Sequence, residues 1–401
     1  MKRWPSIVIT GVIIVYLLLW CVPLLNLKGF NFRYDWKKFG NNDSPSLHAP
    51  LVITMCESTE STLENGENIT DIVSKADTNY EAAFKLRGSW TRQRDQVTTL
   101  LKTLLLFSQS PTWRIIVLTD NDSTFTKIVK ITEGFPDRER SRLLLERRAQ
   151  WYPAAHPELR DDWRPCAWAK QFLAEALPDE DAVVYVDTDV VFLGPAEAIW
   201  SIFGSLDSKQ LIALSAEPQY LFDEPKRFQA GSIGLNTGVI VTNLTRQRQL
   251  PGGSLGSAMI QAGLLNSRYL YRHDQDALNH FLKRKTYLFQ EVSSRWNFIV
   301  GACNKEAPYC VECVSYGIVV LHGADATFYR PIDRKFLAIY DSLLHMSLAE
   351  DPHHLLVKIK RRLDVLDSLH LKDYLCHDYA MFNHAVTVGL SRLVKTGRCK
   401  H

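Results

Sequence analysis

The sequence lacks a strong excess of charge of either sign, and it lacks repeated or low-complexity segments. Its 47 Lys and Arg residues nearly balance 44 Asp and Glu residues, which leaves a formal net charge of +3 at pH 7. This mild charge gives no reason to expect a nucleic-acid partner. The chain has 401 residues, of which 46% are hydrophobic, and this is enough for a sizeable core in one large domain or two ordinary ones.

The sequence also lacks the second cysteine pair of a typical structural zinc site. Cys310 and Cys313 have C-x-x-C spacing, but neither another C-x-x-C nor a matched histidine pair follows. Zinc binding at this pair remains the less favoured alternative to disulfide formation. Seven of the eight cysteines lie beyond the first 30 residues, and in an oxidising compartment some of them should pair. Because seven is odd, at least one thiol stays unpaired.

The N-terminal apolar run lacks a recognisable cleavage site. It covers residues 6–27, and a bilayer is crossed by ~20 residues. A cleaved signal peptide, the alternative, usually has a shorter apolar region followed by small residues. We therefore expect a cytoplasmic tail at 1–5, a transmembrane signal anchor at 6–27 and a stem at 28–49. Lys2 and Arg3 favour a cytoplasmic N-terminus, although further basic residues follow the run.

Four N-x-S/T triplets support a luminal location for the part of the chain beyond the anchor. They begin at Asn42, Asn68, Asn121 and Asn243, and none has proline at the middle position. Together with the cysteines, they predict a single-pass type II membrane protein of the ER or Golgi. The N-terminal helix would then be the contact with the membrane.

Hydrophobic periodicity predicts an α/β fold with a mostly parallel sheet. Apolar runs alternate with segments of helical spacing, which is the pattern of strand–helix–strand units. We expect strands at 50–56, 113–120, 211–218, 235–244 and 316–323, and a further strand that runs through 183–186 and carries Asp187 and Asp189. We expect helices at 91–110, 166–179, 273–284 and over most of 333–401. Residues 57–90 are polar and acidic, and we expect a long loop or insertion there.

Two carboxylates interrupt the apolar stretch "DAVVYVDTDVVFLGP". Asp187 and Asp189 are separated only by Thr188. Alternate residues of a strand share a face, so both side chains should point into the crevice at the end of a parallel strand. Neighbouring carboxylates repel unless a cation lies between them, and oxygen ligands suit Mn²⁺ or Mg²⁺. The pattern therefore predicts a metal site that holds a diphosphate.

Two alternatives to this metal site are weaker. Asp187 and Asp189 could lie in a surface turn, but the apolar runs on both sides argue against it. The stretch also resembles the D-x-D-x-T/V motif of haloacid-dehalogenase phosphatases. That family places the motif on its first strand, whereas here two expected strands precede it.

Several motifs, taken in order, resemble family-eight glycosyltransferases. They are "VVYVDTDVVFLGP", "LNTGVIVTNLTR", "HDQDALN", "WNF" and "GIVVLHG". The resemblance implies a retaining enzyme with a GT-A fold, which has a Rossmann-like sheet, at 50–345. Residues 346–401 would form a helical C-terminal extension. "RPCAWAKQFL" and "LHGADATFYRP" are similar to the glucoside xylosyltransferases within that family.

The resemblance also implies roles for individual residues. The metal ligands would be Asp187, Asp189 and His322, with Mn²⁺ as the cofactor and Mg²⁺ as the alternative. Catalytic roles at the reactive face of the sugar fall to Asp274 and Gln275. Substrate-binding roles fall to Lys170, Asn236, Gly238 and Arg330, where Gly238 permits close approach of the backbone and Arg330 is the nearest candidate for a phosphate contact.

The implied reaction is transfer of xylose from UDP-xylose to O-linked glucose on EGF repeats of the Notch type, in α1,3 linkage. Gln275 is an amide and a poor nucleophile, which favours front-face attack over two successive displacements. Another UDP-hexose transferase of family eight is one alternative. A luminal lectin-like protein without activity is the second.

Two expectations concern the surroundings of the site. We expect Cys303 to pair with Cys310 or Cys313, which would close a small loop beside "RWNF". The segment 217–238 lies between two expected strands of the site. Its aromatic residues would wall the sugar pocket, hold the EGF module or simply pack the loop; they are Tyr220, Phe222 and Phe228.

Overall fold

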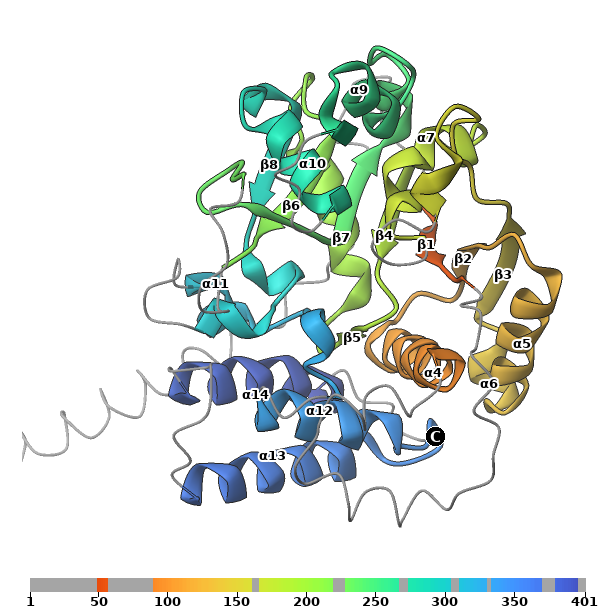
Figure 1. Ribbon diagram of the computed structural model, residues 1–401. Helices are drawn as coiled ribbons and strands as arrows, with labels where there is room; N and C mark the ends of the chain where they lie inside the picture. Colours follow the sequence, from red (N-terminus) through yellow and green to blue (C-terminus); the bar gives the residue numbers. More distant parts are fainter. Residues whose placement is uncertain are drawn as a thin grey trace, which may run out of the picture. The chain divides into compact units, whose positions relative to one another are not determined.

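The computed structural model describes eight segments of the chain (Figure 1). They are residues 49–56, 89–160, 166–218, 228–266, 273–303, 310–329, 333–369 and 379–395. The expected anchor at 6–27, the stem, nearly all of the loop at 57–90, Arg330, Tyr220 and Phe222 lie outside these segments. Within them, no helix combines the length and the apolar character needed to cross a bilayer.

The centre of the fold is a seven-stranded sheet with the order β3-β2-β1-β4-β7-β6-β8. The strands are β1 (Leu51–Thr54), β2 (Trp113–Leu118), β3 (Leu143–Arg148), β4 (Ala182–Val186), β6 (Ile212–Ala216), β7 (Leu235–Asn243) and β8 (Phe289–Val292). Strands β3, β2, β1 and β4 are parallel, and so are β6 and β8. Strand β7 runs antiparallel to both of its neighbours. The α/β expectation with a mostly parallel sheet is confirmed, while β3 and β8 were not predicted.

The strands at the middle of the sheet are continuous apolar runs, because helices cover both faces of the sheet. Every residue of β4, β6 and β7 is buried. In the view of Figure 1, α4, α12, α13 and α14 lie below the sheet, and α7, α9 and α10 lie above it. Asn236 and Thr237 are polar exceptions near the start of β7, and both belong to the site described below.

The expected helices are mostly present. They include α4 (Ser89–Phe107), α10 (His273–Leu282), α12 (Arg334–Leu344), α13 (Pro352–Ser368) and α14 (Tyr379–Lys395). Shorter helices are α5 (Asp122–Glu133), α6 (Asp137–Arg140), α8 (Leu244–Gln247), α9 (Leu255–Gln261) and α11 (Val311–Tyr316). Helix α4 buries the apolar stripe that its spacing predicted, which comprises Val97, Leu100, Leu101, Leu104 and Leu105.

The prediction of one helix at 166–179 is wrong. The segment forms a 3-10 turn, η5 (Ala167–Phe172), followed by the one-turn helix α7 (Leu173–Ala176). Trp168 and Phe172 are both buried, and packing of these rings takes precedence over the helical propensity of the sequence. This irregular backbone also carries Lys170 into the site.

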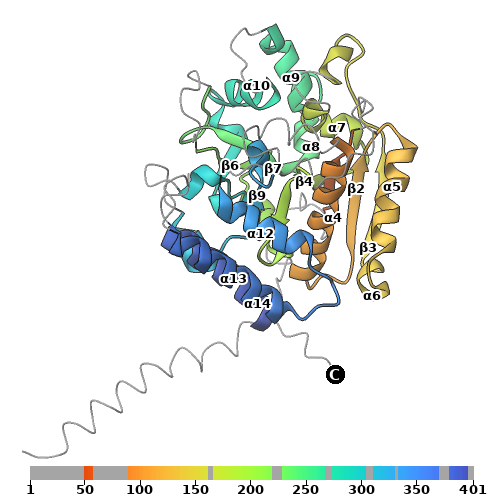
Figure 2. The ribbon, with the colours of Figure 1, turned by 60° about the horizontal axis from the view of Figure 1, so that its bottom comes forward.

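The three C-terminal helices lie next to one another (Figure 2), and α14 also packs on the segment that leads into the site. A second, two-stranded sheet pairs β5 (Val190–Phe192) with β9 (Val320–His322). A Cβ atom at Gly389 of α14 would lie 2.9 Å from the backbone oxygen of Ile318, just before β9. Within 333–369 and 379–395 the structure confirms the helical prediction, and the domain boundary at 345 stays a prediction.

Two disulfides are present among the described residues. Cys56 bonds to Cys166, with 110 residues between them in sequence and 6.1 Å between their Cα atoms. Cys310 bonds to Cys313, so the expectation that Cys303 pairs with either of them is wrong. A bond inside the C-x-x-C motif also leaves no thiolate there for the zinc alternative. The helical turn of α11 brings the sulfurs of Cys310 and Cys313 together.

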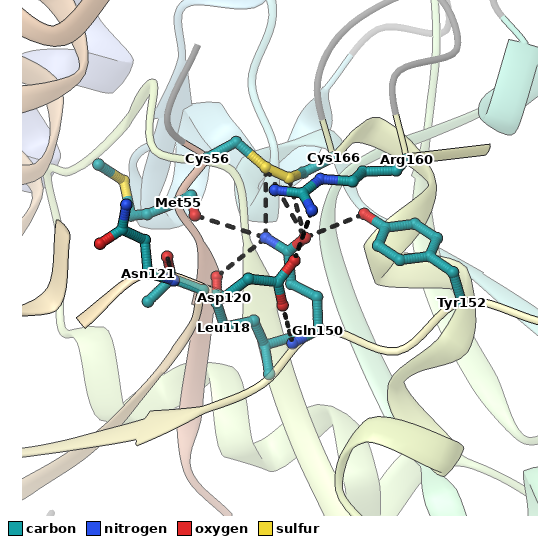
Figure 3. Close-up of a disulfide and its surroundings, with 10 residues drawn as sticks. Met55, Cys56, Leu118, Asp120, Asn121, Gln150, Tyr152, Arg160 and Cys166 are labelled. Atoms are coloured by element: carbon teal, nitrogen blue, oxygen red, sulfur yellow. Dashed lines mark hydrogen bonds and ion pairs between the residues drawn. A yellow bond between two sulfur atoms is a disulfide. The ribbon is translucent and has the colours of Figure 1, made fainter. Parts of the chain in front are cut away.

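The Cys56–Cys166 disulfide joins the end of β1 to the start of η5 (Figure 3). Gln150 lies against its sulfurs and donates from Nε2 to the backbone oxygens of Met55 (3.4 Å) and Leu118 (3.3 Å). The hydroxyl of Tyr152 donates to Gln150 Oε1 at 3.2 Å. The disulfide and this amide therefore hold the ends of β1 and β2 beside the segment that carries Lys170.

Replacing Cys166 with Ser should lower the free energy of unfolding by ~2–5 kcal/mol, because the bond closes a long loop. Denaturant unfolding of the oxidised protein measures this. The control is Cys313→Ser, which opens a loop of three residues and should cost less. Equal costs for the two variants would contradict the loop-length explanation.

The two described N-x-S/T triplets differ in exposure. Asn243 is buried, and its Oδ1 accepts the backbone N–H of Arg246 at 2.9 Å. Asn121 is half-buried at the N-terminus of α5, where it accepts the N–H of Ser123 at 2.7 Å. A linked glycan needs an exposed amide nitrogen, so of these two sites we expect Asn121 to be the occupied one.

Candidate active site

Asp187 and Asp189 lie in a turn between β4 and β5, and the expectation that they alternate along a strand is wrong. Strand β4 ends at Val186 and β5 begins at Val190. The turn is nevertheless held at both ends by backbone hydrogen bonds. The N–H of Asp187 donates to the oxygen of Gly238 (2.8 Å), and the N–H of Gly323 donates to the oxygen of Asp189 (2.7 Å). These bonds hold both carboxylates at the end of the sheet, where a ligand site was expected.

His322, the last residue of β9, joins the two carboxylates. The antiparallel pairing of β5 and β9 places His322 opposite Val190, directly after Asp189. Its Nε2 lies 3.3 Å from Asp189 Oδ1, and one ligand atom from each of Asp187, Asp189 and His322 lies within 4.8 Å of the others. Two carboxylates and an imidazole are a donor set that suits Mn²⁺ or a similar dication. The predicted ligands are thus together, and they fit the metal.

Lys170 lies beside this cluster. Its Nζ is 3.1 Å from Asp187 Oδ1, 3.2 Å from Asp187 Oδ2 and 3.9 Å from Asp274 Oδ2. Burial lowers the pKa of Lys170, but the charges of Asp187 and Asp274 outweigh burial and hold the pKa above its usual value. The ammonium is therefore a permanent positive charge between the two aspartates. Its contact with a nucleotide stays a prediction.

Asp274 is a buried carboxylate in the first turn of α10. Gln171 Nε2 donates to its Oδ2 at 3.4 Å. Burial raises its pKa to about 6; Lys170 opposes this rise and Asp187 adds to it. Asp274 is therefore poised to change its charge in mildly acidic solution.

If the anionic form of Asp274 orients the sugar, activity should fall as the pH drops below about 6, because the carboxylate then takes up a proton. The raised pKa means that the folded protein holds this proton more tightly than the unfolded chain does. Profiles of kcat/KM against pH for the wild type and Asp274→Asn test this. The variant should be slow and should lack this acid limb. Mn²⁺ binding is measured at each pH, so that loss of the metal is not mistaken for protonation of Asp274. An unchanged limb in the variant would assign it to another group.

Gln275 has both ends of its amide engaged. Its Oε1 accepts from the backbone N–H of Thr237 (3.0 Å) and from the hydroxyl of the same residue (3.2 Å). Its Nε2 donates to the carboxylate of Glu217, which is buried just after β6. Sequence reasoning did not assign Glu217 to the site. The available signal was an acidic residue directly after the strand "LIALSA".

Asn236 and His322 are linked through a residue that sequence reasoning also missed. Asn297 donates from Nδ2 to Asn236 Oδ1 at 2.7 Å, and its Oδ1 lies 2.8 Å from His322 Nδ1. Asn236 Oδ1 also accepts the backbone N–H of Gly238 at 2.8 Å. The motif "WNF" was noted in the sequence, but Asn297 was not assigned to the site.

Gly238 permits a close approach, as expected, but the structure gives it a specific neighbour within the protein. A Cβ atom at this position would overlap the imidazole ring of His322 and would lie 2.8 Å from its Nε2. Glycine therefore makes room for the third metal ligand. A contact between Gly238 and the substrate stays a prediction.

Phe228 is the one residue among the three aromatic residues of the 217–238 segment that the structure describes. Its ring stacks on His280 of α10, with 3.8 Å between ring centroids. This contact agrees with the interpretation that the residue packs its own loop. Arg330, like Tyr220 and Phe222, lies outside the described residues.

The described site has more negative than positive charge. The carboxylates of Asp187, Asp189 and Asp274 lie around the ammonium of Lys170. Such an excess favours binding of a dication and disfavours binding of an anion alone. A nucleotide diphosphate would therefore bind together with a metal ion.

Comparison with known proteins identifies the family of the chain. The family model for glycosyl transferase family 8 matches residues 110–323, which is more than half of the chain. The matched range contains eight of the nine candidate site residues, all but Arg330. Mouse glucoside xylosyltransferase 1 is 29% identical over 287 residues, which cover 66% of this chain and 68% of that protein. Zebrafish glucoside xylosyltransferase 1 is 30% identical over 261 residues, or 60% of each chain.

Solved structures give a weaker likeness. Mouse xyloside xylosyltransferase 1 in its apo form has a TM-score of 0.45 and 13% identity, over 70% of this chain and 99% of that chain. The galactosyltransferase LgtC with donor and acceptor sugar analogues has a TM-score of 0.43 and 14% identity, over 77% and 99% of the two chains. We draw no functional conclusion from likeness at this level. From the family match, we conclude that this α/β chain belongs to glycosyl transferase family 8.

Proposed function

We propose that the protein transfers xylose from UDP-xylose to O-linked glucose on EGF repeats, in α1,3 linkage and with Mn²⁺. The observation that carries metal-dependent sugar transfer is the cluster of Asp187, Asp189 and His322 in a family-8 chain. The choice of xylose and of a glucoside acceptor rests on the relatives, which are named glucoside xylosyltransferases at 28–30% identity. The first of these relatives is covered over 68% of its length and the next over 63%.

Mn²⁺, or Mg²⁺ as the alternative, would be held by Asp187, Asp189 and His322 and would neutralise charge on the diphosphate of the leaving UDP. Lys170 adds a second positive charge next to the same carboxylates. Asp274 and Asn236 would orient the donor sugar. The acceptor hydroxyl attacks the anomeric carbon as the bond to the phosphate oxygen breaks, and its proton passes to that oxygen.

The contacts of Gln275 support attack from the front face. A double displacement needs a nucleophile below the sugar, and both ends of this amide are already engaged by Thr237 and Glu217. The role we assign to Glu217 is to hold Gln275 in place. A carboxylate so close to the amide is also the candidate nucleophile of the competing mechanism.

Glu217→Gln should separate these roles. Its amide oxygen can still accept from Gln275, so we expect less than about a tenfold loss of kcat, which is ~1.4 kcal/mol. Glu217→Ala leaves the buried Nε2 of Gln275 without its acceptor, which typically costs ~1–3 kcal/mol. This variant should therefore lose more activity than Glu217→Gln. The exposed Glu350→Gln is the control. Loss of nearly all activity in Glu217→Gln, with recovery on addition of azide, would assign Glu217 as a nucleophile instead.

The proposed function is tested with the full chain, a glucosylated EGF repeat and three donors: UDP-xylose, UDP-glucose and UDP-galactose. We expect a clear preference for UDP-xylose, complete loss of turnover with EDTA and recovery with Mn²⁺. Preference for a hexose donor would keep the family and overturn the xylosyl assignment. Donor binding without transfer or hydrolysis would support the lectin-like alternative.

The type II topology and ER or Golgi location are part of the proposal. Seven cysteines beyond residue 30, two disulfides and the triplet at Asn121 support a luminal catalytic portion. Endoglycosidase treatment of the cellular protein should reduce its apparent mass. A mature N-terminus near residue 25 would overturn the uncleaved anchor.

A further inference from the structure

A chain of hydrogen bonds through Asn297 links two residues of the site that lie on different strands. Asn297 follows the turn η9 (Ser294–Trp296), and its side chain is completely buried. Its Nδ2 lies 2.7 Å from Asn236 Oδ1, and its Oδ1 lies 2.8 Å from His322 Nδ1. Asn297 itself has been assigned neither as a metal ligand nor as a contact of the sugar.

The backbone next to Asn297 holds it firmly against β9. The N–H of Phe298 donates to the oxygen of Val320 at 2.8 Å, and the oxygen of Phe298 accepts the N–H of His322 at 2.9 Å. These bonds place residue 297 at a constant distance from His322. The side chain of Asn297 therefore meets the imidazole in one arrangement.

One backbone donor sets the direction of the whole chain of hydrogen bonds. The N–H of Gly238 can only donate, and it donates to Asn236 Oδ1 at 2.8 Å. The group of Asn297 that faces this same oxygen must then be its NH₂. Its carbonyl oxygen consequently faces His322, and that oxygen can only accept.

The tautomer of His322 follows from this order. In the neutral imidazole, Nδ1 must carry the proton that is donated to Asn297, and Nε2, which lies 3.3 Å from Asp189 Oδ1, then carries the lone pair. This is the form in which an imidazole can bind a metal ion through Nε2. The same amide also holds Asn236, so the two ends of the site are joined by one side chain.

We propose that Asn297 is a positioning residue that holds His322 as a metal ligand through its Oδ1 and holds Asn236 toward the donor sugar through its Nδ2. The proposal rests on the metal site of the proposed function. It does not depend on which sugar is transferred. Its consequence is that the affinity for the metal and the affinity for the donor sugar are separable by changing one end of one amide.

Two substitutions remove different parts of the amide. Asn297→Leu has a similar size and removes both hydrogen bonds. Asn297→Asp keeps an oxygen that accepts from His322 but offers no donor to Asn236. Loss of a partner of this kind typically weakens metal binding ~10–100-fold.

The experiment measures binding of Mn²⁺ alone to the full chain, by calorimetry or by electron paramagnetic resonance. Asn297→Leu should raise the Kd for Mn²⁺ about 10–100-fold, and Asn297→Asp should stay within about threefold of the wild type. Asn297→Asp should instead raise the KM for UDP-xylose with a smaller change in kcat. The matched control is Asn243→Leu, which removes a buried amide at the other end of β7 and should leave Mn²⁺ binding unchanged.

Circular dichroism and thermal unfolding show whether each variant is folded, and the comparison of the two Asn297 variants is then decisive. Wild-type affinity for Mn²⁺ in Asn297→Leu would overturn the proposal, and so would equal weakening in folded Asn297→Asp and Asn297→Leu. If the wild type binds Mn²⁺ but transfers no xylose, only the proposed function fails. If the wild type binds no Mn²⁺, the positioning role fails with it.

Discussion

Asp189→Asn is expected to abolish metal-dependent transfer, with a loss of at least ~10³-fold in kcat, which corresponds to ~4 kcal/mol of transition-state stabilisation. Asp189 is half-buried, and its Oδ1 lies 3.3 Å from Nε2 of His322, so the amide would remove a charged ligand from the centre of the cluster. Asp187→Asn and His322→Ala should behave in the same way. Steady-state rates over a range of Mn²⁺ concentrations measure the effect.

The fold should survive this change, because the two like charges of the cluster repel each other when no cation lies between them. Thermal unfolding without metal should therefore show an unchanged or slightly higher midpoint for Asp189→Asn. The exposed Asp364→Asn on α13 controls for removal of a charge elsewhere. A wild-type rate in Asp189→Asn, or a rate that EDTA leaves unchanged, would contradict the metal site.

Gly238→Ala should also weaken metal binding and activity, and it does so through a single methyl group. The added Cβ would overlap the ring of His322, which is buried and held on its other side by Asn297. The ring must leave the position in which its Nε2 lies beside Asp189, and we expect Mn²⁺ binding to fall at least ~10-fold together with activity. Titration with Mn²⁺ and the rate of transfer both report this change.

A matched control and a double variant make the explanation specific. Gly204→Ala adds a methyl group at a position where no heavy atom lies within 4 Å, so it should have no effect. In a His322→Ala background, Gly238→Ala should cost little further stability, because the ring that it meets is gone. Full additivity of the two stability losses would mean that the methyl group acts on something other than His322.

The local pattern of the sequence predicted β1, β2, β4, β6 and β7 of the central sheet and the place of Asp187 and Asp189, whereas His322 was assigned from the family resemblance. Strand β4 and the residues 238–241 of β7 are apolar runs in a sheet that is covered on both faces, and such runs are visible without any tertiary information. Asp187 and Asp189 follow the run of β4, and His322 ends the run of β9, which pairs with β5 directly after Asp189. The helical stripe of α4 was predictable for the same reason, since its period depends only on nearby residues.

Tertiary structure alone decided the conformation and the partners within the site. Asp187 and Asp189 lie in a turn because backbone hydrogen bonds hold them there: Asp187 donates to Gly238, and Asp189 accepts from Gly323. Both glycines are far away in sequence. The segment at 166–179 became a 3-10 turn because Trp168 and Phe172 pack into the core. Local propensity cannot anticipate contacts that depend on how distant segments meet.

The partners of Gln275 and His322 show the same limit. Glu217 and Asn297 lie 58 and 25 residues from the side chains they contact, and neither has a local pattern that indicates its partner. The pairing of Cys310 with Cys313, and not with Cys303, depends on the turn of α11. The sequence by itself determined which residue types collect at the end of the sheet, because periodicity and strand ends are local properties. Only the folded chain decided which atom of each residue faces which neighbour, because strand pairing and side-chain packing bring together residues that are distant in sequence.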